Sequence, residues 1–101
     1  MLAIELGDDG RVTMAGRLDS IRAAAAQEAL DRTSGTVTLD CAALNYLSSA
    51  GLGVLLRTHK RLLEGGGKLR LTGVNGHLLD IFNYSGLSEV FEIEPAGKPA
   101  P

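Results

Sequence analysis

The sequence predicts an α/β fold built on a mixed, mostly parallel β-sheet. After an opening hairpin, helical and strand patterns alternate three times along the chain, an order that usually yields parallel strands joined by crossover helices. The 101 residues, of which 45% are hydrophobic and 22% charged, suit one globular domain. We expect this domain over residues 1–94. A flexible tail is expected over residues 95–101, which hold all three prolines.

Alternating apolar residues predict an N-terminal β-hairpin. Leu2, Ile4 and Leu6 fall on one face of a strand, and the following residues 7–10 are typical of a turn. The second strand of the hairpin is expected over residues 11–16.

A first helix is expected over residues 21–32, where an alanine-rich stretch has high helix propensity. Just ahead of it, Asp19 and Ser20 carry oxygens that accept hydrogen bonds from the free N–H groups of a helix start. The alternating, β-branched segment 36–40 then predicts a central strand.

The second half of the chain repeats this alternation. Apolar residues at helical spacing predict a helix over residues 52–64, and the glycines 65–67 end it. Residues 68–72 alternate in the manner of a strand. Residues 77–84 carry the apolar positions of a short helix, and a last strand is expected over residues 90–93.

Charge and hydropathy argue against several classes of partner. The formal net charge of -2 gives no broad positive field, so nucleic acid is not an expected partner. No apolar run approaches the roughly 20 residues that a membrane-spanning helix needs, and the N-terminus lacks a basic and apolar signal segment. We therefore expect a cytoplasmic protein that does not bind membranes directly.

No chemically reactive group stands out. Cys41 is the single cysteine and His59 lies far from His77, so neither a disulfide nor a metal site is expected. We interpret Cys41 as a small apolar residue at a strand end, His59 as part of the inner edge of a helix and His77 as a polar helix-start residue. Gly51 and Gly53 lack the third glycine of a dinucleotide-binding loop. No catalytic residues and no cofactor are expected.

The most informative segment joins the central strand to the following helix. Ser48 and Ser49 stand where an N-cap residue is expected. Small residues at Ala50, Gly51 and Gly53 leave the first helical turn unshielded on its outer side, where a partner protein can approach the backbone. From the residues alone, the two serines are either helix caps or part of a binding site.

This arrangement resembles the STAS family, in particular the bacterial anti-sigma factor antagonists. The resemblance covers nearly the whole chain and is carried by five groups of residues: Gly16-Arg17-Leu18-Asp19, Leu39-Asp40, Ser48-Ser49-Ala50-Gly51-Leu52-Gly53-Val54-Leu55, Gly65-Gly66-Gly67 with Leu69 and Leu71, and Ser85-Gly86-Leu87. It implies a STAS fold, with crossover helices packed mainly on one face of the sheet.

The resemblance also implies a site. In the family, a serine two residues before the first glycine of the helix start is phosphorylated, and that position here is Ser49, with Ser48 as the alternative acceptor. Ser48 takes the place of a family aspartate, and Ala50 that of a Ser or Thr. Asp19 aligns with an aspartate near the phosphorylation loop, where it either shapes the partner surface or caps a helix. The implied partner-binding residues are Asp19, Ser48, Ser49, Ala50, Gly51, Leu52 and Gly53.

The implied function is partner switching. An anti-sigma factor with serine kinase activity, a GHKL-type ATPase, would bind the unphosphorylated chain and release its sigma factor. Phosphate on Ser49 would end this complex, and a PP2C-type serine phosphatase would restore it. ATP and magnesium belong to the kinase, and the chain itself is not expected to be an enzyme.

Two other functions stay open. The chain is alternatively a constitutive STAS subunit of a transporter, such as a lipid-transport ATPase, or of a signalling complex, in which the serine is only a cap. A small-ligand or nucleotide binder is the third possibility. The basic residues Arg57, Lys60 and Arg61 are interpreted either as a solvated helix face or as a patch that meets an acidic kinase surface.

Overall fold

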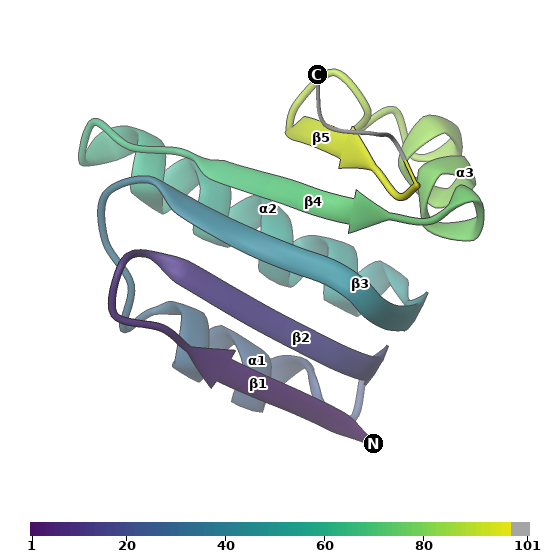
Figure 1. Cartoon of the computed structure of the whole chain (residues 1–101), viewed down its shortest axis with the longest axis horizontal. Coiled ribbons are helices and arrows are strands. Elements are labelled where there is room, and N and C mark those ends of the chain that lie inside the picture. Colours follow the sequence, from purple (N-terminus) through teal and green to yellow (C-terminus); the bar gives the residue numbers. More distant parts are fainter. Residues whose placement is uncertain (98–101) are drawn as a thin grey trace.

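The computed structural model describes residues 1–97, which form a five-stranded sheet and three helices (Figure 1). The elements in chain order are β1 (Leu2–Leu6), β2 (Arg11–Leu18), α1 (Ala23–Leu30), β3 (Val37–Leu47), α2 (Ser49–Glu64), β4 (Leu69–Val74), α3 (Gly76–Tyr84) and β5 (Glu92–Pro95).

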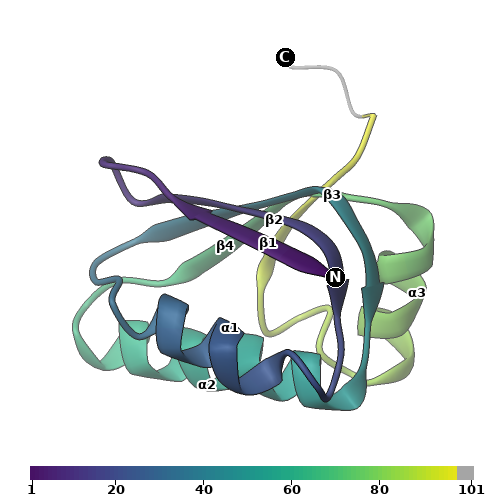
Figure 2. The same ribbon diagram turned by 90° about the horizontal axis from the view of Figure 1, so that it is seen from below.

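Strand order in the sheet follows chain order, β1-β2-β3-β4-β5. The hairpin pair β1 and β2 is antiparallel, and the three other neighbouring pairs are parallel. Helices α1 and α2 lie side by side against one face of the sheet, and α3 packs beside the end of β3 (Figure 2). The predicted α/β class, the hairpin and the placement of the helices mainly on one face are therefore confirmed.

The core lies between this sheet face and the helices. Side chains alternate between the two faces of a strand, and Leu39 of β3 and Leu71 of β4 lie in one buried core with Leu55 of α2, all three fully buried. Each such leucine stabilises the fold by roughly 1.5–3 kcal/mol through removal of its side chain from water. Burial of one face is what fixes the register of the strands.

Strand β3 is much longer than the predicted segment 36–40, because it continues to Leu47. Its pairing with β2 shifts by one residue at two places, near Ala42 and again before Tyr46. Such β-bulges bend the strand that carries the extra residues. They also disturb the alternation of apolar residues, which is why the sequence pattern ended at residue 40. Cys41 consequently lies within the strand rather than at its end.

The bends in β3 carry its last residues toward the helix layer (Figure 2). On the neighbouring strand, Gly73 has a φ of 67°, and a side chain there would meet the backbone of Ala42 at 3.0–3.1 Å. Glycine at this position leaves room for the bend. Leu44 and Leu47 can then both be buried, and only Ser48 separates β3 from α2.

The last strand begins two residues later than predicted, at Glu92 instead of Val90. Val90 lies in a turn and is 40% exposed, whereas Phe91 is buried against the rings of Phe82 and His59. Strand β5 includes Pro95, so it extends past the predicted domain boundary at residue 94. Residues 98–101 of the predicted tail lie outside the described residues.

Candidate functional site

The residues singled out in the sequence meet where β2 and β3 end. Leu18 pairs with Leu47 as the last residue of each strand, and the N–H of Ser48 donates a hydrogen bond to the carbonyl oxygen of Leu18 at 3.0 Å. Asp19 follows Leu18 directly, and α2 starts at Ser49. The structure thus brings Asp19 and the start of α2 to the same edge of the sheet.

The two adjacent serines have different environments. Ser48 is half-buried, has extended backbone angles and accepts a hydrogen bond on its Oγ from the N–H of Gly51 at 3.2 Å. It is therefore the N-cap of α2. Ser49 is the first residue of the helix and is exposed, and its hydroxyl makes no hydrogen bond within residues 1–97. Ser48 is thus one of the two serines expected to cap this helix, and α2 begins three residues ahead of the apolar pattern that starts at Leu52.

The two glycines of this turn face different surroundings. Gly51 was expected to leave the outer side of the helix open, but it is buried against the end of β2. A Cβ atom on Gly51 would lie 2.7 Å from the carbonyl oxygen of Leu18, so only glycine fits this close contact. Gly53 is half-buried, as are Ala50 and Leu52. Because Gly51 is buried, it is not part of the surface that this turn exposes to a partner.

Asp19 is not the N-cap of the first helix, which was one of the two interpretations of this residue. Helix α1 begins at Ala23, and its N-cap position, Arg22, makes no side-chain capping bond. Instead, the carboxylate of Asp19 closes the preceding turn: Oδ1 accepts from the N–H of Arg22 at 3.1 Å, and Oδ2 from Nη1 of Arg22 at 2.8 Å. The turn separates Asp19 from the helix, which is shorter than the predicted 21–32.

The carboxylate of Asp19 is held in its ionised form. Its side chain is only 15% exposed, and this burial opposes ionisation. The hydrogen bonds from Arg22 and Ile21 and the charge of Arg22 outweigh the burial, so the pKa of Asp19 lies below its ordinary value. A negative charge is therefore fixed beside the start of α2 at neutral pH.

Arg17 and Tyr46 also lie at this edge, and neither was predicted from the sequence as a site residue. Arg17 Nε lies 3.8 Å from Oδ2 of Asp19, and its guanidinium stacks over the ring of Tyr46 at 4.0 Å. The two residues are paired across β2 and β3. This pairing depends on the bulges of β3, and an alternating pattern alone does not reveal them.

Two other candidate residues of the sequence have structural roles. His59 is buried on the inner side of α2, as predicted, and its Nδ1 accepts the N–H of Leu69 at 3.1 Å. Burial, with a smaller effect of the charge of Asp40, raises the pKa of Cys41 to about 12. Its thiol therefore stays protonated at neutral pH and is unreactive.

The three basic residues Arg57, Lys60 and Arg61 of α2 have different environments. Arg61 is half-buried and donates hydrogen bonds to the carbonyl oxygen of Leu30 and to Thr33. Arg57 is exposed but donates from Nε to Gln27 at 3.1 Å. Lys60 is simply exposed. The three side chains therefore differ in exposure and in hydrogen-bond partners.

Comparison with known proteins identifies the family. Residues 3–94 match the family model described as "Mlab, STAS domain". This chain belongs to the STAS domain family. An anti-sigma-B factor antagonist of Listeria monocytogenes is 30% identical to this STAS chain over 87 residues, which cover 82% of this chain and 76% of that protein.

Two solved structures share this fold. An anti-sigma factor antagonist from Mycobacterium paratuberculosis has a TM-score of 0.76 at 22% identity, covering 96% of this chain and 86% of that chain. The Bacillus cell fate determinant SpoIIAA in its phosphorylated form has a TM-score of 0.63 at 20% identity, covering 97% and 93%. Within residues 1–97, no helix is long and apolar enough to cross a membrane.

The division of roles between the serines predicts unequal effects on stability. We expect Ser48→Ala to lower the free energy of unfolding by about 1 kcal/mol, because the N–H of Gly51 loses its acceptor. The matched control, Ser49→Ala, removes an exposed hydroxyl and should change it by less than about 0.5 kcal/mol. Urea unfolding of both variants measures the difference. Equal destabilisation would contradict the assignment of Ser48 as the cap.

The environment of Asp19 predicts a pH-dependent effect of Asp19→Asn. Because the folded-state pKa is lowered, the carboxylate stabilises the fold at pH values above its unfolded pKa of roughly 3.9 and loses this effect as pH falls through the folded pKa. The variant should be less stable than wild type at pH 7, and the two should converge in acid. Unfolding curves between pH 2 and about 7 test this. A difference independent of pH would show that charge is not involved.

Proposed function

We propose that this STAS domain is an anti-sigma factor antagonist that works by partner switching, with Ser49 as the phosphorylated residue. The observation that carries the proposal is the exposed hydroxyl of Ser49 at the first position of α2. Ser48 Oγ already accepts a hydrogen bond, so it is less available to a kinase. The name of the Listeria relative supports the general role.

The start of α2 suits a phosphate group. The first turn of a helix leaves N–H groups without intrahelical partners, and the helix dipole places partial positive charge there. A phosphoserine carries roughly -1.5 to -2 charges at neutral pH. The fold should therefore tolerate the modification, and SpoIIAA, which has the same fold, exists in a phosphorylated form.

Phosphorylation would change the surface rather than the fold. A partner that covers Ser49 in the unmodified protein would have to bury the new charge or place its own carboxylates against it. Without a compensating cation, either costs on the order of several kcal/mol. The complex would therefore dissociate while the domain remains folded.

The partners follow from this role. We propose that a GHKL-type anti-sigma factor with serine kinase activity binds the unphosphorylated domain in the cytoplasm and supplies ATP and magnesium for the transfer. A PP2C-type serine phosphatase would return the domain to its binding form. The domain would regulate sigma-factor-dependent transcription without catalysing a reaction. Asp19, fixed as an anion beside α2, would form part of the surface that the kinase contacts.

Incubation with ATP and the serine kinase encoded nearest the gene tests the proposal. Peptide mass spectrometry should find a single phosphate on Ser49, and Ser49→Ala should abolish its incorporation, whereas Ser48→Ala should retain it. A phosphate on Ser48 would preserve the switch but contradict the assignment of the residue. The absence of any phosphate would contradict the switch itself.

One observation favours a second function. Ser48 stands where the family pattern has an aspartate, and its side chain serves as a helix cap. If no kinase recognises this loop, the domain would instead be a constitutive subunit of a transporter or signalling complex. A stable complex with such a partner, unaffected by Ser49→Asp, would support this alternative.

A further inference from the structure

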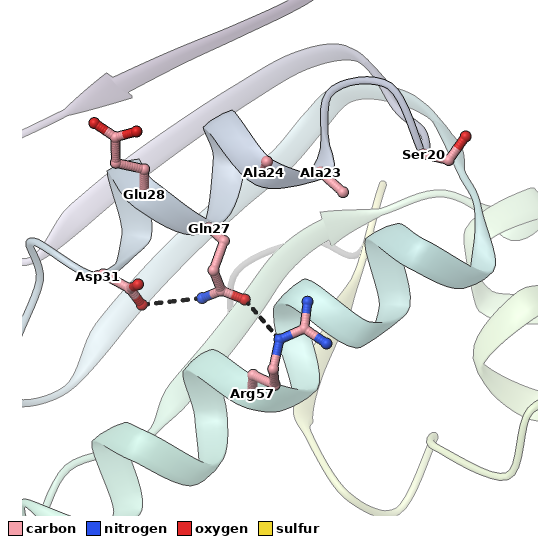
Figure 3. A pocket seen from close by; sticks show the side chains of 7 residues that line it. All are labelled: Ser20, Ala23, Ala24, Gln27, Glu28, Asp31 and Arg57. Atoms are coloured by element: carbon pink, nitrogen blue, oxygen red, sulfur yellow. Dashed lines mark hydrogen bonds between the residues drawn. The ribbon is translucent and has the colours of Figure 1, made fainter.

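A shallow groove of about 540 Å³ runs along the outer side of the two packed helices α1 and α2 (Figure 3). Small side chains from α1, Ala23 and Ala24, form part of its wall, together with Ser20 from the turn ahead of that helix. Arg57 of α2 lies across from them. Small side chains therefore line part of the α1 side of the groove, and the α2 side carries a cation.

The guanidinium of Arg57 is held in place by Gln27. Gln27 Oε1 accepts from Nε of Arg57 at 3.1 Å, while Gln27 Nε2 donates to Asp31 Oδ1 at 3.0 Å (Figure 3). Gln27 Nε2 also donates to Thr58 Oγ1 at 3.1 Å. The bonds to Asp31 and Thr58 fix the orientation of the Gln27 amide whose oxygen binds Arg57. Only Nε of Arg57 is used, and Nη1 and Nη2 make no hydrogen bond within residues 1–97.

Gly53 brings this guanidinium close to the start of α2. A Cβ atom at Gly53 would lie 3.1 Å from Nη1 of Arg57, so the arginine side chain lies back along the helix over the glycine. Residues four apart occupy the same helix face, which places Ser49 one turn beyond Gly53 on that side. A partner that covers Ser49 therefore also reaches the free donors of Arg57.

The other charges that line the groove are already neutralised. Glu28 pairs with Arg32 at 3.5 Å, and Asp31 pairs with Arg61 at 3.7 Å. Arg57 differs from them, because the group it bonds is a neutral amide and no carboxylate pairs with it within residues 1–97. The groove therefore presents an unpaired, oriented cation on its α2 side.

We propose that Arg57 is a specificity-determining residue that binds a carboxylate of the partner kinase through Nη1 and Nη2. An arginine fork matches a carboxylate in a two-point, charge-assisted hydrogen bond, and the bond to Gln27 fixes the fork in advance. The inference rests on the proposed partner switching and adds to it the acidic chemistry of the docking surface.

An acidic docking surface also explains why phosphate on Ser49 would end the complex. A kinase carboxylate drawn to Arg57 lies about one helical turn from the phosphorylated side chain. At that separation the two like charges repel each other, and exclusion of water from the interface strengthens the repulsion. The same acidic group would therefore favour the unmodified protein and reject the phosphorylated one.

Affinity measurements with the serine kinase encoded nearest the gene test the inference. Arg57→Gln should weaken binding of the full chain about tenfold or more, because it removes the fork and its charge. Arg57→Lys keeps the charge without the fork and should weaken binding less. The matched control is Lys60→Gln, which removes an exposed cation from the same helix and should change the dissociation constant by less than about twofold.

The outcomes separate this inference from the proposed function. If wild type binds and is phosphorylated on Ser49 but Arg57→Gln binds equally well, the role of Arg57 is wrong and partner switching stands. If Lys60→Gln weakens binding as much as Arg57→Gln, general attraction between charges replaces the specific contact. If wild type does not bind the kinase, both the proposed function and the inference fail. Melting temperatures of all variants check that each one is folded.

Discussion

The site depends on the close contact between Gly51 of α2 and the carbonyl oxygen of Leu18. Only glycine fits this contact, because the Cβ atom of any other amino acid at position 51 would lie 2.7 Å from that oxygen. The same oxygen accepts the N–H of Ser48 at 3.0 Å. The first turn of α2 is therefore anchored to the end of β2, and Asp19 is held next to it. Ser49 follows the anchored cap and is left exposed, which is the arrangement that a surface switch requires.

The bends of β3 make this contact possible. Two extra residues relative to β2 turn the end of the strand toward the helix layer, and Gly73 of the neighbouring strand leaves room for the first bend. A straight strand would carry residue 48 away from Leu18. The bulges also bring Tyr46 beside Arg17, whose guanidinium in turn approaches Asp19. Backbone irregularity in one strand thus determines which side chains share the edge with Ser49.

Much of this architecture could be predicted from the sequence because it follows from periodic patterns. The hairpin, the helix ended by Gly65 and the central strand all follow from regular apolar spacing, and the serines ahead of α2 follow from their capping preference. The resemblance to STAS proteins added the grouping of Asp19 with Ser49. Contacts that depend on strand irregularity or on one side chain reaching another element have no such periodic signal.

The structure differs from the predictions where strands are irregular or where side chains contact distant elements. β3 continues past residue 40 because backbone pairing tolerates bulges that interrupt the apolar alternation. Gly51 faces inward because it packs against the carbonyl oxygen of Leu18, a contact between segments distant in sequence. Arg57 was grouped with Lys60 and Arg61 by spacing alone. Its orientation over Gly53 depends on Gln27, 30 residues earlier in the chain.

The central claim is that phosphate on Ser49 changes what the domain binds while leaving it folded. Calorimetric titration of the serine kinase with the unmodified domain and with the domain phosphorylated on Ser49 tests this claim most directly. The account predicts stoichiometric binding of the unmodified form and affinity at least about tenfold weaker for the phosphorylated form, with an unchanged melting temperature. Equal affinity of the two forms would contradict it, as would loss of binding that accompanies unfolding.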